Sequence, residues 1–202
     1  MGRTTNPVKT GRPREFSEEA ALDAAMRVFW EKGYEGTSLD DLTRAMGINR
    51  SSLYATFGDK EKLFTRVIAQ YSEGPLAFIR EALQRATAQA VVEHLLRSTV
   101  SFLGDSTHPR GCLSLQGGLA CGSSAEGVKR AMIEWRKHGL KQLEKRMLRA
   151  QKGGDLRRDV DAKDLARYIF VVMNGLSVQA VNGATQAEMN RTVKMALRSM
   201  PL

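Results

Sequence analysis

The sequence contains little cysteine, histidine, proline or aromatic side chain. Its 202 residues include two cysteines, three histidines and five prolines, and Phe, Trp and Tyr together make up 6%. Two cysteines without a paired Cys/His spacing exclude a disulfide scaffold and a structural zinc site, and we expect no metal. The low aromatic and proline contents favour an all-helical fold over a sheet-rich one.

Long apolar runs are also missing. The longest stretch, around residues 168–181, is interrupted by Asn174 and Gln179 and is too short to span a bilayer. Residues 1–14 lack the apolar segment of a signal peptide. Because 42% of the residues are hydrophobic and 26% are charged, a globular core can form. We therefore expect a soluble, cytoplasmic protein without membrane contacts.

Motifs that indicate catalysis are not found. The sequence has no nucleophile elbow, no phosphate loop and no dinucleotide fingerprint, so we expect neither an enzyme nor a bound cofactor. His94, His108 and His138 show no metal or catalytic-triad spacing. We expect these histidines at the surface or at the rim of a pocket.

Positive charge is in clear excess: 31 Lys and Arg stand against 22 Asp and Glu, a formal net charge of +9. Residues 1–14 contain four basic residues and no acidic one. This composition predicts a flexible basic arm that contacts nucleic acid through Arg12 and Arg14, although a solubilising tail explains it equally well. Charge alone therefore does not decide the function.

Capping residues and helical periodicity predict three helices after the arm. The first ends at a glycine, and the second is joined to the third by a tight turn at Gly47, which can adopt a left-handed conformation. Two short helices joined by such a turn and braced by a preceding helix form a helix-turn-helix, whose last helix presents its first residues to a DNA major groove. The predicted helices span residues 17–33 with cap Ser17, 38–46, and 50–56 with cap Asn49. The second has a capping-box-like start, in which Thr37 and Ser38 are followed three residues later by Asp40 and Asp41.

This region resembles the DNA-binding domain of the TetR/AcrR transcriptional repressors. The resemblance covers residues 15–70 and departs from the usual pattern at Asn49 and Thr56, beside or within the reading helix. It implies an all-helical homodimer, most simply a repressor, that binds a palindromic operator and leaves DNA when a small molecule occupies its C-terminal domain. The matching segments are 36–42 (GTSLDDL), 45–54 (AMGINRSSLY), 57–60 (FGDK) and 63–64 (LF).

The expected DNA contacts lie at the helix starts. Arg50 is the expected base reader, because arginine is the commonest partner of guanine. Tyr54 can donate its hydroxyl to a phosphate, and Thr37 and Lys60 can hold phosphates beside the positive ends of helix dipoles. In addition to the arm, the predicted DNA-binding residues are Thr37, Ser38, Asn49, Arg50, Ser51, Ser52, Tyr54, Thr56 and Lys60.

The remainder of the chain, residues 59–202, is predicted to form a helical bundle that binds the effector and dimerises, following the arm at 1–14 and the helix-turn-helix domain at 15–58. A long helix over 59–86 is expected to kink at Gly74-Pro75, where proline removes a backbone donor. The other expected helices cover residues 91–103, 125–152, 162–182 and a last segment that starts at Thr185.

The helix over 162–182 is apolar on two faces, which indicates burial on both. One face is expected to form a four-helix seam with a second subunit, since a palindrome needs two reading heads about 34 Å apart. The predicted seam residues are Leu165, Ile169, Val172, Leu176, Ala180, Met189, Val193 and Leu197. The predicted effector pocket combines apolar walls with a few polar groups: Phe102, Cys112, Gln116, Met132, Trp135, Met173 and Asn174.

Two further hypotheses remain open at this stage. Cys112, at a predicted helix start, is a candidate thiol sensor, since the resemblance includes relatives that sense oxidants or electrophiles. Its nine-residue separation from Cys121 argues against a disulfide on one continuous helix. The alternative function is a nucleic-acid or anion-binding module without operator specificity. It would act through a basic row at helical spacing: Lys137, Lys141, Lys145, Arg149 and Lys152.

Overall fold

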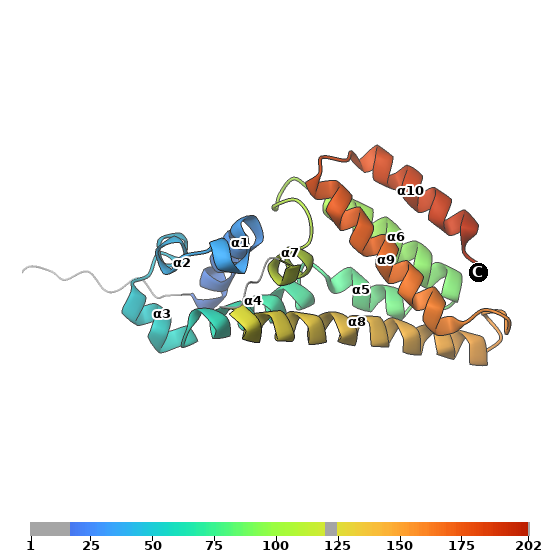
Figure 1. The fold of residues 1–202 in the computed structure, drawn as a ribbon, viewed down its shortest axis with the longest axis horizontal. Helices are drawn as coiled ribbons and strands as arrows, with labels where there is room; N and C mark the ends of the chain where they lie inside the picture. Colours follow the sequence, from blue (N-terminus) through green and yellow to red (C-terminus); the bar gives the residue numbers. More distant parts are fainter. Residues whose placement is uncertain (1–16, 120–124, 202) are drawn as a thin grey trace, which may run out of the picture.

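The computed structural model describes residues 17–119 and 125–201, and all regular elements within these ranges are helices. The predicted all-helical fold is confirmed (Figure 1). The basic arm with Arg12 and Arg14, and Cys121, lie outside the described residues. The helices are α1 Glu18–Gly36, α2 Leu39–Met46, α3 Arg50–Phe57, α4 Lys60–Glu73, α5 Ala77–Leu83, α6 Ala88–Leu103, α7 Leu113–Leu119, α8 Glu126–Lys152, α9 Ala162–Val181 and α10 Gln186–Ser199.

Side-chain caps explain why the first helices begin where they do. Ser17, Ser38 and Asn49 each accept a hydrogen bond from a backbone N–H three residues later, which satisfies one of the free donors at the helix start. Gly33 has a positive φ of 69° inside α1, so the regular helix ends there as predicted. Gly47, at φ 67° in the left-handed region, separates α2 from α3.

The predicted long helix over 59–86 is instead two helices. α4 ends at Glu73 and α5 begins at Ala77, with Gly74-Pro75 between them. Gly74 leaves the helical region with φ −97° and ψ −91°, and Pro75 has no backbone donor with which to continue the helix. The sequence signal for a kink therefore marks a complete break.

Two hydrophobic cores form the interior. The first joins α1–α4 to Leu113 of α7 and to the start of α8, through Val128 and Met132. The second contains α5, α6, the later part of α8, α9 and α10. Helix α8 belongs to both cores and runs along the molecule from α4 to the far end of the second core (Figure 1). The first core thus extends past residue 58, to α4, α7 and α8.

Six of the eight predicted dimer-seam residues are buried in the chain's own second core, so their side chains are not available to a second subunit. Ile169 of α9 is fully buried and Leu176 is 2% exposed, packed in the second core with α6 and α10. The two-sided apolar pattern did not reveal which side faces the chain's own core. The other predicted seam residues lie in or against the same core: Leu165, Ala180, Met189 and Val193 are buried, and Val172 and Leu197 are half-buried.

No helix within residues 17–119 and 125–201 is long and apolar enough to cross a membrane. This agrees with the interrupted apolar stretch seen in the sequence.

Candidate DNA-binding surface and effector cavity

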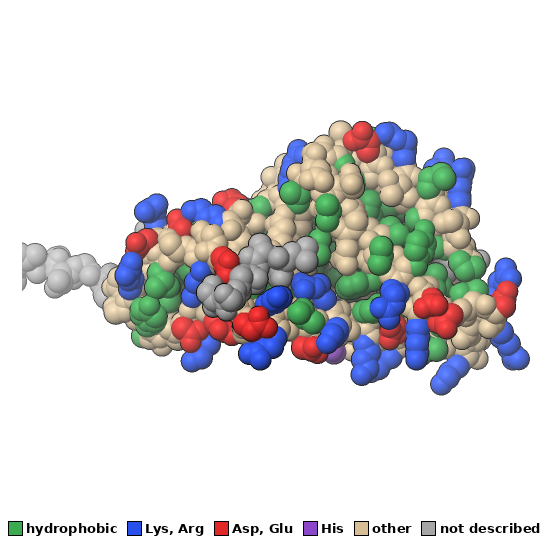
Figure 2. Space-filling view, viewed as in Figure 1, with side chains coloured by type: hydrophobic (Ala, Val, Ile, Leu, Met, Phe, Trp, Pro, Cys, Tyr) green, Lys and Arg blue, Asp and Glu red, His purple; other side chains and the backbone are tan. Residues whose placement is uncertain are grey.

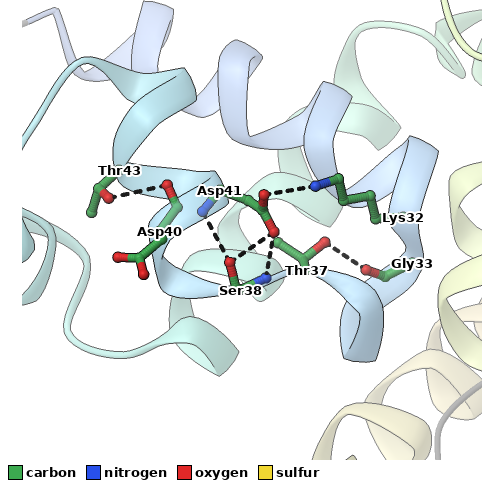
Figure 3. A network of polar contacts seen from close by, with 7 residues as sticks. All are labelled: Lys32, Gly33, Thr37, Ser38, Asp40, Asp41 and Thr43. Carbon is green, nitrogen blue, oxygen red and sulfur yellow. Dashed lines mark hydrogen bonds and ion pairs between the residues drawn. The ribbon is translucent and has the colours of Figure 1, made fainter.

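A compact polar network fixes the start of α2 against α1 (Figure 3). Ser38 Oγ accepts from the Asp41 backbone N–H at 3.0 Å, and Asp41 Oδ2 accepts from the Ser38 backbone N–H at 3.0 Å, which completes a capping box. Lys32 of α1 donates to Asp41 Oδ1 at 2.6 Å. The hydrogen bonds from Lys32 and Ser38 hold the pKa of Asp41 well below its usual range. The carboxylate therefore ties α2 to α1.

Thr37 does not have the predicted role at a phosphate. Its side chain is 1% exposed, and its hydroxyl donates to the Gly33 carbonyl oxygen at 2.7 Å. The neighbouring Ser38, which is exposed, is the residue that caps α2. The sequence offered two adjacent hydroxyl residues, and the structure buries the first of them.

The start of α3 is exposed to solvent. Asn49, Arg50, Ser51 and Tyr54 lie on the surface, and Tyr54 is 49% exposed. Asn49 Oδ1 accepts from the Ser52 backbone N–H at 2.8 Å and from Ser51 Oγ at 2.7 Å, so the cap also orients the first turn. The opposite side of α3 is anchored in the first core by buried side chains, Leu53 and Phe57. Ser52 and Thr56 are half-buried beside this surface.

Arg50 has a protein partner that the sequence did not indicate. Its Nη2 lies 2.8 Å and its Nε 3.3 Å from Asp40 Oδ1, so one carboxylate oxygen of α2 accepts from two donors of the guanidinium. The hydrogen bonds and charge of Asp40 raise the pKa of Arg50. From the sequence, Asp40 was expected only to take part in the start of the second helix.

Lys60 opens α4, next to the cap Asp59, and its ammonium lies 4.4 Å from the centre of the Tyr34 ring. This cation–π contact keeps the Lys60 charge near the DNA-binding helices. Lys60 lies at a helix start, as predicted.

A cavity of about 400 Å³ opens between α5, α6, α8 and α9. Five of the seven predicted pocket residues line it: Phe102, Cys112, Trp135, Met173 and Asn174. Met132 and Gln116 do not. Met132 points into the first core and is 2% exposed, because this turn of α8 packs toward α4. Gln116 donates through Nε2 to the Arg110 carbonyl oxygen at 3.2 Å.

The walls of the cavity are mostly apolar, and several of its hydroxyls are already bonded to the backbone. Thr99 donates to the Leu95 carbonyl oxygen at 2.7 Å, and Ser177 donates to that of Met173 at 3.1 Å. Among the described residues that line the cavity there is no Asp or Glu, whereas three basic side chains are present. The basic residues are Arg80, Arg136 and His138, and further apolar walls come from Leu76, Phe78, Leu143 and Phe170, none of which the sequence analysis named.

Cys112 lies at the cavity wall with two hydroxyl neighbours. Its Sγ is 3.4 Å from Tyr71 Oη, which donates to it, and 3.0 Å from Ser114 Oγ. Burial, followed by the nearby thiol, raises the pKa of Tyr71 well above its ordinary value, so the phenol stays a donor.

Stacked rings connect this wall to the DNA-binding domain. The Trp30 ring of α1 stacks on His108 at 4.6 Å and on Phe102 at 5.7 Å between centroids, and Tyr71 meets Trp30 edge-on at 4.9 Å. Trp30 also donates to the Gly111 carbonyl oxygen at 3.3 Å. His108 is half-buried and lines a surface pocket with Trp30 and Thr107, as its prediction at a pocket rim implies, and its ring also packs against Trp30 and Phe102.

Both the N-terminal and the C-terminal part of the chain match known protein families. Residues 21–67 match the family described as bacterial regulatory proteins of the tetR family, and residues 88–196, more than half of the chain, match the tetracyclin repressor-like C-terminal domain. The chain belongs to the TetR family. It is therefore a DNA-binding transcriptional regulator of a family whose members act as dimers.

Several TetR-family proteins resemble the chain over most of its length. A solved cysteine mutant of the regulator CifR, complexed with 26bp double-strand operator DNA, has a TM-score of 0.89 and 39% identity, covering 95% of this chain and 100% of that one. The repressor ComR of Escherichia coli is 28% identical, covering 95% of this chain and 92% of its own. The uncharacterized regulator YezE of Bacillus subtilis is 34% identical, covering 79% and 83%.

In this TetR-family chain the side of α9 opposite the core carries exposed apolar residues. Val171 is 60% exposed, and the others lie on the same side of the helix. Figure 2 shows hydrophobic side chains gathered over the face where α8 and α9 lie. The exposed residues are Tyr168 at 44%, Val171, Val178 at 44% and Val181 at 49%. An exposed apolar face of this kind marks an interaction surface.

The charge of Asp41 predicts a pH-dependent stability. We expect Asp41→Asn to lower the melting temperature at pH 7, because the amide loses the charged partner of Lys32. The folded-state pKa is lowered, so this contribution is complete above the unfolded pKa of about 3.9 and disappears as the pH falls further. The difference from wild type, followed by circular dichroism, should therefore shrink from about pH 5 to about pH 2.

Glu31→Gln, which removes an exposed carboxylate elsewhere on α1, is the matched control. If Asp41→Asn lowered the melting temperature equally at every pH, the hydrogen bonds of the cap rather than its charge would account for the effect.

Proposed function

We propose that the chain is a ligand-responsive repressor that binds a palindromic operator as a homodimer through α3, in the cytoplasm, and acts by binding rather than by catalysis. The observation that carries this proposal is the exposed, capped start of α3 with Arg50 at its first position, in a chain that matches the TetR family in both halves. The CifR structure with operator DNA supports it, since its fold is closely similar.

The alternative module, acting through the basic row of α8, has less support. Lys137, Lys141 and Lys145 are indeed exposed along that helix, with Arg149 and Lys152 at its end. A solvated helix face accounts for such a row at a cost of only a few tenths of a kcal/mol per like-charged pair. Both family matches favour operator binding instead.

Arg50→Ala tests the DNA surface. We expect specific binding to fall about tenfold to a hundredfold, since one bidentate arginine–guanine contact is worth about 1–3 kcal/mol of discrimination. The melting temperature should hardly change, because the side chain is 60% exposed. The operator is first recovered by selecting bound duplexes from a random-sequence pool, and affinities are then measured by fluorescence anisotropy.

Lys163→Ala is the control for this experiment, because it removes one exposed positive charge at the start of α9, far from α3 (Figure 1). Operator selectivity that survived Arg50→Ala at full strength would remove Arg50 from the reading surface.

The exposed side of α9 is the proposed dimer face. Its apolar residues have no partner in the chain's own core, and pairing two copies would remove them from water. We expect Val171→Arg to give folded monomers in sedimentation equilibrium, because an unpaired charge would lie in the seam. Leu176→Arg should instead abolish cooperative unfolding, since that side chain is in the core. A folded dimer of Val171→Arg would place the seam elsewhere.

The cavity defines the class of inducer that we propose. Its apolar walls and internally bonded hydroxyls suit a largely apolar molecule, and Asn174 supplies a polar group on α9. Without a lining carboxylate among the described residues, a cation would have no charged partner, whereas Arg136 and His138 suit a neutral or anionic group. We therefore propose an uncharged or anionic, largely apolar inducer.

Modification of Cys112 is the second proposed route to release. The thiolate sulfur of Cys112 attacks one carbon of the N-ethylmaleimide double bond, and the other carbon of that bond takes a proton from water. In a Cys121→Ser background we expect the adduct at the cavity wall to displace Phe102 and Tyr71 and release operator DNA in an anisotropy assay. The variant that also carries Cys112→Ser should stay bound. Equal release from both proteins, or from neither, would dismiss the thiol route.

A further inference from the structure

We propose that Asp40 is a positioning residue of the DNA-binding surface: its ion pair with Arg50 holds the guanidinium in one orientation for base reading and so sets operator specificity. This inference rests on the proposed function, because it requires Arg50 to contact DNA. The two residues are ten positions apart and lie on different helices, so the turn between α2 and α3 brings them together.

The geometry leaves the reading edge of Arg50 available. Asp40 Oδ1 accepts from Nη2 at 2.8 Å and from Nε at 3.3 Å, so the carboxylate occupies the Nε–Nη2 edge of the guanidinium. The ion pair uses one hydrogen of Nη2 and none of Nη1, so both terminal nitrogens of this 60% exposed side chain retain donors. Those are the donors that match O6 and N7 of guanine in a bidentate contact. The ion pair thus orients the side chain without consuming the donors that guanine needs.

Asp40 itself has a fixed position. It lies in the first turn of α2, between Ser38 and Asp41 of the capping box, and Thr43 Oγ1 donates to its backbone carbonyl oxygen at 3.3 Å. Figure 3 shows the Asp40 carboxylate directed away from the Ser38–Asp41–Lys32 network, so the cap does not use it. A carboxylate that the cap does not use, on a rigid helix start, is available to hold Arg50.

The negative charge of Asp40 should oppose DNA binding, so its place beside Arg50 requires an explanation. A carboxylate on a DNA-facing surface repels phosphates and weakens binding to every sequence. In free solution the pair contributes little, because Arg50 is 60% and Asp40 66% exposed. Once DNA excludes water, the pair strengthens, and an arginine already held in place loses less conformational freedom on binding. Binding affinity is therefore increased only for sequences that present a guanine to Arg50.

Asp40→Asn distinguishes two effects of the carboxylate on operator affinity, because they have opposite signs. Removing its charge reduces phosphate repulsion and raises affinity, whereas losing the orientation of Arg50 lowers affinity. Affinity is measured for the operator duplex that wild type recovers from a random-sequence pool and for a duplex with the same bases in scrambled order. Loss of one negative charge should leave scrambled DNA bound as tightly or more tightly. If Asp40 positions Arg50, operator binding weakens nonetheless, and the ratio of operator to scrambled affinity falls by about tenfold.

Three variants complete the design. Asp40→Glu keeps the carboxylate and should retain more of the ratio than Asp40→Asn. Glu31→Gln makes the same charge change on α1, away from Arg50, and should leave the ratio unchanged. In an Arg50→Ala background, Asp40→Asn should produce no further fall, since the residue it positions is gone. Melting temperatures verify that every variant is folded.

The outcomes separate this inference from the function on which it rests. If wild type recovers no preferred duplex, operator binding itself is wrong. If wild type prefers its operator and Asp40→Asn keeps or improves that preference, Asp40 acts only as a repulsive charge and the positioning role is overturned.

Discussion

The packing of aromatic rings between the two hydrophobic cores is the interaction on which the rest of the molecule depends. Trp30 belongs to the core of the DNA-binding helices, and the Phe102 ring that stacks on it also lines the effector cavity. Tyr71 contacts both rings. Because protein interiors are closely packed, a molecule that displaces Phe102 must also disturb the packing of α1. The core of the DNA-binding helices and the cavity therefore meet directly at the Trp30–Phe102 ring contact.

Helix α8 provides the second connection between the two halves. Val128 and Met132 belong to the first core, whereas Leu143 and Met147 belong to the second. A continuous helix of 27 residues transmits displacement along its axis because its backbone hydrogen bonds resist bending. The break at Gly74-Pro75 has the opposite effect, since α4 and α5 are not one rigid rod. Together these features allow α4 and α8 to respond differently to a change at the cavity.

Structural features that local sequence signals decide were predicted most accurately. Caps and turn glycines act within four residues, so the helix-turn-helix and the surface position of Arg50 could be predicted from spacing alone. Tertiary packing decided the rest. Leu176 and Val171 are both apolar residues of α9, and only the position of α6 and α10 shows that the first is core. Asp40 was missed because its partner depends on the geometry of a turn, and Thr37 because burial separates it from Ser38.

Two hydroxyls of the cavity already donate to backbone carbonyls, and this limits how finely the proposed site can discriminate between similar molecules. With Thr99 and Ser177 engaged in this way, the proposed inducer site would discriminate chiefly through the shape and length of its apolar walls. An apolar pocket separates molecules that differ by one methylene by only about 1–3 kcal/mol, whereas a pocket built on hydrogen bonds rejects an imperfect ligand far more strongly. A site of this kind would respond to a class of related compounds rather than to a single metabolite.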